Sequence, residues 1–343
     1  MSERLELPQP YLVFIADVDD PRYAKTAKGL IDWVPEQCVG EWALPGNPLR
    51  LGLPVLDPVA ARARGARSLV IGVAPVGGRI LPAWVSALAQ ALEAGLDLVS
   101  GMHTPLAGIP ALAAAAERCG RRLIDVRIPP SDLPVASGYP RSGRRVLTVG
   151  TDCAVGKKYT ALALTRAFRE RGVDVSFRAT GQTGILIAGE GLPIDAVKAD
   201  FIAGAAELLS PPADPEHWDV IEGQGSLIHP GYAAVSLGLL SGSQPNVLVL
   251  CHELGRTHVS GYGPDFPLLP PAALIDLNLA HARLRRPDAR CAGVSLNTGA
   301  VSEDMAEQAM RALEQELGLP VADPLRGGSR LAALVEHCLC GNV

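Results

Sequence analysis

Short apolar runs alternate with amphipathic segments along most of the chain. In the first third, runs rich in branched residues predict strands, and the Ala- and Leu-rich stretches between them have helical spacing. We expect strands at residues 12–16, 68–74, 96–100 and 122–126, and helices at 81–94 and 109–119. Strands that alternate with helices of this length predict βαβ units around a parallel sheet.

A proline-rich stretch, residues 128–143, separates this region from a second one with the same alternation. Four prolines and several small polar residues in sixteen positions are typical of a linker between domains. Beyond it we expect strands at 146–149, 174–179, 218–221, 246–251 and 291–296, and helices at 157–171, 196–209 and 302–317. The sequence therefore predicts an α/β protein with one domain over 1–127 and a larger one over 144–343.

The amino-acid composition excludes several classes of protein. Of the 343 residues 48% are apolar and the net charge is −5, which excludes a disordered chain and argues against a broad nucleic-acid-binding face. Seven scattered cysteines without a C-x-x-C pair predict free thiols rather than disulfides or a metal site. No signal peptide and no apolar run of about 18 residues is present, so we expect a cytoplasmic protein that is not in a membrane.

One motif carries most of the functional argument. The strand at 146–149 leads into a glycine-bounded loop that ends at the start of a helix. Successive N–H groups in such a loop, the helix N-terminus and a lysine together bind phosphate groups. The residues expected to bind the cofactor are Gly150, Thr151, Asp152, Cys153, Ala154, Val155, Gly156, Lys157 and Lys158. The sequence predicts a phosphate loop that holds a diphosphate.

Two departures from the usual loop bear on its chemistry. Five residues, not four, separate Gly150 from Gly156, and Lys158 stands where a Ser or Thr normally binds Mg²⁺. An ammonium group has no lone pair for a cation, so Mg²⁺-dependent NTP hydrolysis is disfavoured and we expect no metal site. Lys158 itself either neutralises a phosphate or is solvated. The loop N–H groups favour a lowered pKa for the Cys153 thiol, although a small residue that fits a tight loop is the preferred interpretation.

Further polar groups follow the ends of the predicted strands, where α/β sheets bind ligands. Candidates for catalysis, as a base or a proton carrier, are Glu222, His229, His252 and Glu253. Candidates for binding the substrate are Arg178, Gln182 and Arg256, the arginines through a carboxylate. Asn297 also ends a strand, and its carboxamide can pair with both edges of a base.

Several longer segments resemble one family. The loop GTDCAVGK and the segments ATGQTGILIAGEG, DAVKADFIAGAAE and EGQGSLIHPGYAAVSLGLLSGSQP are similar to the DgcN-type D-glutamate (D-amino-acid) N-acetyltransferases, long known as a domain of unknown function. The resemblance implies a small Rossmann-like N-terminal domain and a P-loop NTPase-like three-layer C-terminal domain with a mainly parallel sheet. It also implies acetyl transfer from acetyl-CoA to the amino group of a D-amino acid, D-glutamate foremost. By position, the loop would hold the CoA phosphates, Asn297 the adenine, and Glu222 would lie at the chemistry.

Acetyl transfer needs a neutral amine, so a general base is expected, but the sequence does not rank the four candidates. Backbone N–H groups of the glycine-rich turns, or Gln182, would stabilise the oxyanion. Two other functions stay open: an ATP- and Mg²⁺-dependent ligase of dethiobiotin-synthetase type, and a regulatory protein that binds a nucleotide or CoA without turnover. The expected partners are small-molecule substrates and further copies of the chain in a homo-oligomer.

Overall fold

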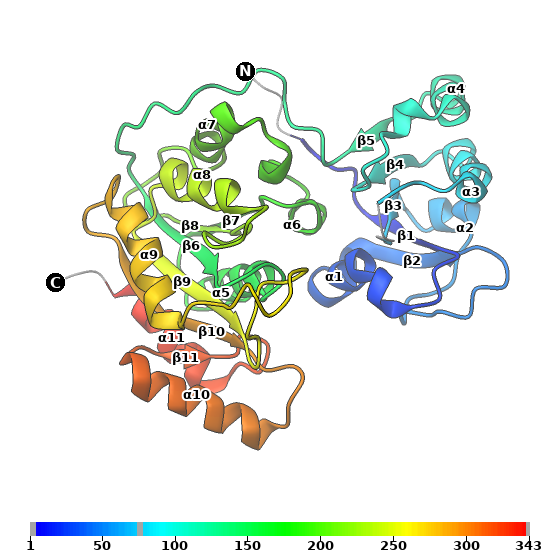
Figure 1. The fold of residues 1–343 in the computed structure, drawn as a ribbon. Coiled ribbons are helices and arrows are strands. Elements are labelled where there is room, and N and C mark those ends of the chain that lie inside the picture. Colours follow the sequence, from blue (N-terminus) through cyan, green and yellow to red (C-terminus); the bar gives the residue numbers. More distant parts are fainter. Residues whose placement is uncertain (1–4, 74–77, 341–343) are drawn as a thin grey trace. The chain divides into compact units, whose positions relative to one another are not determined.

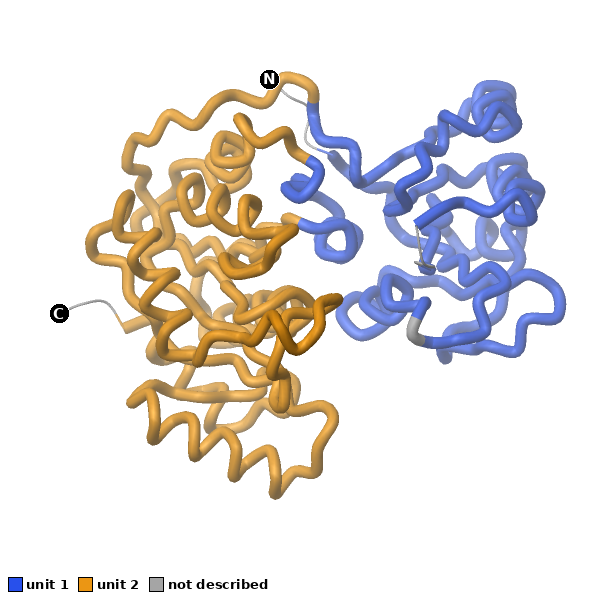
Figure 2. Tube along the Cα trace, viewed as in Figure 1, with its two compact units in different colours: residues 1–130, 181–196 blue, residues 131–180, 197–343 orange. Residues whose placement is uncertain are grey.

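The computed structural model of the protein describes residues 5–73 and 78–340. The chain divides into two compact units (Figure 2): unit 1 comprises residues 1–130 and 181–196, and unit 2 comprises residues 131–180 and 197–343. Among the described residues, no helix has the length and the apolar character needed to cross a membrane. All seven cysteines are free thiols.

Unit 1 is built on a parallel five-stranded sheet with the order β2-β1-β3-β4-β5. Its strands are β1 (Tyr11–Ala16), β2 (Cys38–Ala43), β3 (Ser68–Ile71), β4 (Asp97–Ser100) and β5 (Leu123–Asp125). All six residues of β1 are buried, because helices cover both faces of the sheet at this central strand. Sequence alone places the apolar run but not its position between β2 and β3.

The helices of unit 1 lie on both faces of this sheet (Figure 1). They are α1 (Lys25–Trp33), α2 (Pro58–Ala63), α3 (Pro82–Glu93), α4 (Pro110–Cys119) and α6 (Gln182–Ala188). Short 3₁₀ helices span Pro21–Tyr23, Pro35–Gln37, Leu106–Gly108 and Ile194–Ala196. Helix α3 packs against α4, and α1 packs against α6.

Helix α6 belongs to unit 1 although it lies within the range 144–343 that the sequence assigns to the second domain. The Tyr11 hydroxyl donates to the carbonyl of Leu186 at 3.0 Å, and the Leu7 N–H donates to the carbonyl of Gly189 at 3.0 Å. Burial raises the pKa of Tyr11 to about 12, so this hydroxyl stays protonated as a donor. The segment 181–196 is therefore tied to β1 through the Tyr11 side chain, and to the residues before β1 through a backbone hydrogen bond.

Unit 2 contains a parallel six-stranded sheet with the order β11-β10-β9-β6-β8-β7. Its strands are β6 (Arg144–Gly150), β7 (Val175–Arg178), β8 (Trp218–Ile221), β9 (Val247–Glu253), β10 (Arg290–Asn297) and β11 (Val321–Ala322). Since all strands run in one direction, the loop after β6 lies between the ends of its neighbours β8 and β9. Parallel strands thereby bring the motifs of unit 2 to one edge.

Helices cover both faces of the unit 2 sheet as well (Figure 1). They are α5 (Lys157–Glu170), α7 (Ile202–Leu209), α8 (Ala233–Ser243), α9 (Pro271–Arg283), α10 (Glu303–Leu317) and α11 (Gly328–Leu339), with a 3₁₀ helix at Ala199–Phe201. One core cluster joins α5 and α11 to the strands and contains Phe168 and Trp218, whose rings meet edge to face at 5.7 Å. Helices α7, α8 and α9 pack in succession.

The two-unit α/β architecture with parallel sheets confirms the predicted fold class. Each predicted strand and helix is present within a few residues, except that the helix expected over 196–209 begins only at Ile202, after the 3₁₀ turn. The strand expected over 68–74 ends at Ile71, and residue 74 lies outside the described residues. Several elements were not predicted, namely α1, β2, α2, α6, α8, α9, β11 and α11.

Candidate functional site

The predicted phosphate loop connects β6 to α5. Ala154 and Gly156 have φ values of +57° and +108°, which turn the loop sharply before the helix. A Cβ atom at Gly150 would lie 2.7 Å from the Lys157 ammonium, so only glycine leaves room for that group beside the end of β6. The loop therefore folds back over its own lysine.

Lys157 is buried, with 7% of its surface exposed. Its Nζ donates a hydrogen bond of 2.7 Å to the carbonyl oxygen of Asp152. Burial lowers the pKa of Lys157, while the neighbouring Asp152 and Glu222 raise it. The Lys157 side chain is therefore held inside the loop by the Asp152 carbonyl.

Asp152 fixes the loop through its fully buried carboxylate. The carboxylate accepts hydrogen bonds from the N–H groups of Cys153 and Ser260, each at 2.7 Å. It also accepts one from Arg256 at 3.0 Å, and Arg256 in turn pairs with Glu253 through Nε at 2.8 Å. Arg256, expected to bind a substrate carboxylate, thus bridges two carboxylates of the protein.

Glu222 lies at the end of β8, next to the loop. Its Oε2 accepts the Thr180 N–H at 3.0 Å, and its carbonyl accepts the Thr180 hydroxyl at 2.6 Å. The next residue, Gly223, donates its N–H to the Thr148 hydroxyl at 2.9 Å, and a Cβ at this position would overlap the Thr148 carbonyl. Close backbone approach at Gly223 therefore holds Glu222 beside the phosphate loop.

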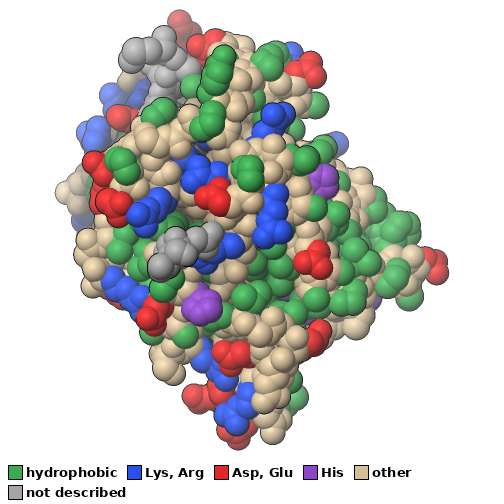
Figure 3. Space-filling view, turned by 90° about the vertical axis from the view of Figure 1, so that its left-hand side faces the viewer, with side chains coloured by type: hydrophobic (Ala, Val, Ile, Leu, Met, Phe, Trp, Pro, Cys, Tyr) green, Lys and Arg blue, Asp and Glu red, His purple; other side chains and the backbone are tan. Residues whose placement is uncertain are grey.

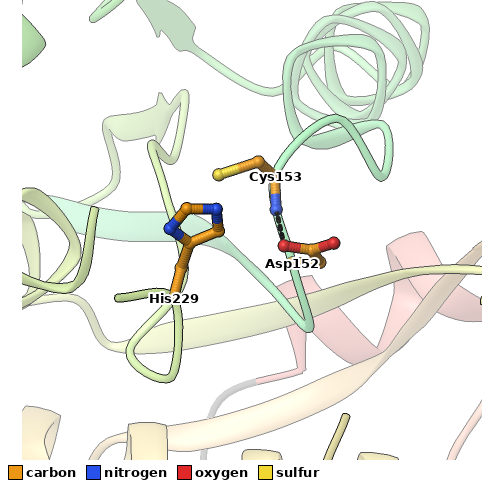
Figure 4. Close-up of side chains that lie close together, drawn as sticks. All are labelled: Asp152, Cys153 and His229. Atoms are coloured by element: carbon orange, nitrogen blue, oxygen red, sulfur yellow. Dashed lines mark hydrogen bonds between the residues drawn. The ribbon is translucent and has the colours of Figure 1, made fainter. Parts of the chain in front are cut away.

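His229 faces the loop from the segment after β8. One ligand atom from each of Asp152, Cys153 and His229 lies within 4.8 Å of the others, and the Cys153 thiol points toward the imidazole (Figure 4). His229 Nδ1 accepts the Gly231 N–H at 3.1 Å, so the neutral ring carries its proton on Nε2. Stacking on Tyr232, with ring centroids 4.6 Å apart, fixes the ring. His229 therefore offers a hydrogen-bond donor to the loop.

The same three residues suit a metal ion poorly. The Asp152 carboxylate already accepts three hydrogen bonds, one of them from the Arg256 cation. The proton on His229 Nε2 occupies the lone pair that a metal would need. Burial raises the pKa of the Cys153 thiol because desolvation exceeds the effect of Lys157, which agrees with the preferred interpretation of a small residue in a tight loop and not with an activated thiol.

Three more candidates lie at the ends of β9 and β10. His252 Nδ1 lies 2.9 Å from the Thr151 hydroxyl, and burial lowers the pKa of this histidine. Glu253 is the register partner of Asn297 across the two strands. The Asn297 carboxamide oxygen accepts the Gly299 N–H at 3.1 Å, which leaves its amide N–H₂ as the donor side. The sheet thus brings His252, Glu253 and Asn297 to the edge that carries the loop.

Helix α5 does not supply a hydroxyl for Mg²⁺ at its start. The Lys158 ammonium lies 5.1 Å from the centroid of the Tyr159 ring. The Thr160 hydroxyl bonds to the Gly156 carbonyl at 3.0 Å and to the Ser295 hydroxyl at 2.7 Å. Thr160 is therefore engaged within the protein and does not replace the missing Ser or Thr.

Arg178, a predicted substrate-binding residue, does not join this group. Arg178 Nε donates to the Asp219 carboxylate at 2.6 Å. In the strand register Asp219 lies beside Arg145, near the start of β6 and therefore at the end of the strand opposite the loop. Gln182 is the first residue of α6 in unit 1, where its carboxamide lies against Gly101.

Other residues of the site were not named as site candidates from the sequence. Thr180 and Ser260 bind Glu222 and Asp152 from loops that lie far from them along the chain. Beside Asn297, the Thr298 hydroxyl donates to Asp323 at 2.6 Å and accepts from Arg326 Nε at 2.7 Å. Thr180 and Thr298 follow strands, and Thr180 also lies in the segment ATGQTGILIAGEG, whereas Ser260 has no such signal.

The fold and this site define a two-domain α/β protein in which a Rossmann-like unit accompanies a P-loop unit. In comparison with known proteins, residues 36–129 match the Rossmann-like N-terminal domain of DUF1611, a domain of unknown function, and residues 134–334 match its C-terminal P-loop domain. The second match includes residues 181–196, which the structure places in unit 1. The chain belongs to the DUF1611 family.

Characterised relatives exist. The chain is 48% identical over 320 residues to a D-glutamate N-acetyltransferase of Tritonibacter scottomollicae, which covers 93% of this chain and 96% of the relative. It is 46% identical over 325 residues to a D-glutamate N-acetyltransferase of a Pseudoalteromonas species, with 94% and 97% covered. A crystal structure of a DUF1611 family protein from Anabaena variabilis is similar with a TM-score of 0.83 at 36% identity, over 96% of this chain and 99% of that one.

Proposed function

We propose that this protein is an acyltransferase that moves the acetyl group of acetyl-CoA to the amino group of D-glutamate. One observation carries the proposal: two relatives that share 48% and 46% of their residues with this chain, over nearly the whole length, are D-glutamate N-acetyltransferases. The identity spans both units, so it includes the phosphate loop and its surroundings. A ligase or a binding protein without turnover has no comparable support.

In this proposal the loop holds the diphosphate of CoA. The N-terminus of α5 supplies N–H donors and a partial positive charge, whereas the N–H groups of Thr151 and Cys153 are bound within the protein. The Lys157 ammonium leaves the Asp152 carbonyl, 2.7 Å away, for a phosphate oxygen, and His229 donates through Nε2. Asn297, at the end of β10, offers its carboxamide to the adenine.

We propose His252 as the general base that takes the proton of the D-glutamate ammonium group. Burial lowers its pKa, so the ring is neutral near pH 7, and Thr151 fixes the ring through Nδ1. The other candidates are engaged differently: His229 carries a proton on the nitrogen that faces the loop, and Glu253 is paired with Arg256. Glu222 holds Thr180 in place and stabilises the charge of Lys157.

The chemical step conserves atoms and charge. The neutral amine attacks the thioester carbonyl, and the C–S bond breaks as the amide forms. The attacking nitrogen loses a proton, the CoA thiolate takes up a proton and leaves as a thiol, and the proton that His252 first took from the ammonium group passes to solvent. A tetrahedral oxyanion develops between these events, and backbone N–H groups of the glycine-rich turns are suited to stabilise it. No step in this sequence requires a metal ion.

The test is to incubate the protein with acetyl-CoA, D-glutamate and EDTA, and to measure free thiol together with N-acetylglutamate by mass spectrometry. We expect thiol and product in equal amounts with D-glutamate, and little of either with L-glutamate. Turnover that requires Mg²⁺ and ATP and releases ADP would establish the ligase instead. Binding of CoA without any product would establish a regulatory protein.

A further inference from the structure

A second polar cavity lies in unit 2, at the edge of the sheet opposite the phosphate loop. Its volume is about 400 Å³, and it is lined by residues that precede or begin β6, β8, β9 and β10. The charged residues in its wall are Arg141, Arg144, Arg286, Arg290 and Asp288. Figure 3 views the molecule from the side on which the strands of unit 2 begin, and basic side chains gather near the middle of that face.

Two of these arginines have buried N–H groups that lack a hydrogen bond. The Arg141 side chain is only 8% exposed, and its Nη1 lies 3.4 Å from the Glu207 carboxylate without bonding to it. Arg286 Nε lies 2.9 Å from Asp288, again as an ion pair without a hydrogen bond. A buried donor without a partner costs roughly 1–3 kcal/mol, more for a charged group. These two N–H groups have no exposed surface, so they add to the local excess of positive charge rather than contact a ligand directly.

The positive charge around the cavity is only partly compensated. Arg141 donates to the Gly242 carbonyl at 2.7 Å and Arg290 to the Cys338 carbonyl at 3.0 Å, which satisfies N–H groups without a full negative charge. Just behind the wall, burial lowers the pKa of Arg145 to about 10, and repulsion from Arg141 and Arg286 adds to this effect. The guanidinium groups therefore repel one another.

We propose that this cavity binds a small multivalent oxyanion, a molecule with phosphate or carboxylate groups, at a site separate from the phosphate loop. Guanidinium groups bind both kinds of oxyanion through paired N–H donors, and this suits Arg more than Lys. The volume falls in the range of roughly 300–1,000 Å³ that is typical of small-molecule sites. The site does not depend on the proposed acetyl transfer, since none of its residues belongs to the loop edge.

The test uses inorganic pyrophosphate and citrate as probes, titrated by calorimetry into the full-length protein with ionic strength held constant by sodium chloride. Lys157→Met disables the phosphate loop, so any binding that survives in this variant belongs elsewhere. Arg144→Gln combined with Arg286→Gln disables the cavity. These two arginines are chosen because Arg144 pairs with Glu216, which is 76% exposed, and Arg286 with Asp288, which is 56% exposed, so the fold should tolerate their loss.

We expect Lys157→Met to bind at least one of the probes at a single site, and addition of the two cavity substitutions to weaken this binding at least tenfold. Binding of pyrophosphate alone would identify a phosphate ligand, and binding of citrate alone a carboxylate ligand. Arg118→Gln with Arg311→Gln removes the same charge from two exposed ion pairs and should leave binding unchanged.

Two results would overturn the proposal: no binding of either probe to Lys157→Met, or equal binding with and without the cavity arginines. Circular dichroism of each variant shows whether it is folded. The cavity variant should retain acetyl transfer to D-glutamate in the absence of added anions. The two proposals thus fail separately, because loss of anion binding with intact turnover contradicts only the second site.

Discussion

The ammonium group of Lys157 donates to the carbonyl oxygen of Asp152, five residues earlier in the chain, at 2.7 Å. The lysine side chain is therefore fixed by the loop itself. Arg256 and Ser260 hold the carboxylate of the same Asp152, and this sets the position of its carbonyl oxygen. The binding group of the site is organised by a buried anion that does not itself meet the ligand.

Replacement of Lys157 by methionine should weaken CoA binding about 10- to 100-fold, because a hydrogen bond between charged groups contributes roughly 1.5–3 kcal/mol. Methionine keeps most of the buried volume, so the fold should persist. Calorimetric titration with CoA measures the effect. Lys158→Met is the matched control and should show a smaller change, since its ammonium lies by the Tyr159 ring. Unchanged affinity in Lys157→Met would contradict the role of the loop.

Replacement of His252 by asparagine should lower kcat for D-glutamate acetylation about 10²- to 10⁴-fold, the usual contribution of a general base. In the unmodified protein the acid limb of kcat/KM should lie below pH 6.5, because burial lowers the pKa of His252 from that value and the base form persists at lower pH. A profile of kcat/KM between pH 5 and 9 checks both points. An asparagine variant that keeps the acid limb would exclude His252 as the base.

The same lowered pKa has a consequence for stability. The unfolded chain binds the His252 proton more readily than the folded protein does. The contribution of this group to stability is therefore complete above pH 6.5 and decreases as the pH falls through the lower, folded-state pKa. Urea unfolding at several pH values should show a decrease toward acid that is smaller in His252→Asn.

For His229, the donor role predicts a difference between two substitutions. Glutamine retains an N–H donor at about the reach of Nε2, whereas phenylalanine retains only the ring that stacks on Tyr232. His229→Gln should therefore bind CoA within a few-fold of the unmodified protein, and His229→Phe should bind it about tenfold more weakly, the loss of one good hydrogen bond. If the phenylalanine variant bound CoA equally well, the ring would serve packing alone.

Gly223→Ala should destabilise the protein by about 3 kcal/mol, because the new methyl group overlaps the Thr148 carbonyl, which is backbone and cannot move aside. Gly263→Ala is the control, since a methyl group there meets nothing within 4 Å. Thermal unfolding of the two variants gives the comparison. Equal melting temperatures would show that β6 and the residue after β8 separate more easily than the structure indicates.

The local architecture around the loop could be predicted, because it depends on neighbours in sequence. An apolar run, two glycines and a lysine before an amphipathic segment specify strand, loop and helix, and the structure places β6, the loop and α5 as expected. The clustering of Glu222, His252 and Asn297 with the loop was also foreseeable, since each ends a strand of a parallel sheet.

Features that depend on contacts between distant segments could not be predicted from the sequence. Arg178 ends a strand of the parallel sheet, as Glu222 does, so the sequence placed it near the loop. In the structure its guanidinium binds Asp219 on the adjacent strand instead of lying at the loop edge. The helix α8 has no clear amphipathic pattern because Gly and Ser occupy much of it, and only its packing against α7 makes it recognisable. The cavity of arginines joins residues from 141 to 340 that share no motif.

By itself, the sequence of this protein determined two α/β domains and a phosphate loop, because periodicity and turn chemistry act over a few residues. Acyl transfer was implied only by the resemblance of its longer motifs to one family. Tertiary structure alone decided which nitrogen of His229 carries the proton, which acids hold Arg256, and that residues 181–196 fold with unit 1. Those outcomes depend on contacts between distant segments, and such contacts are set by packing and by the need of every buried polar group for a partner.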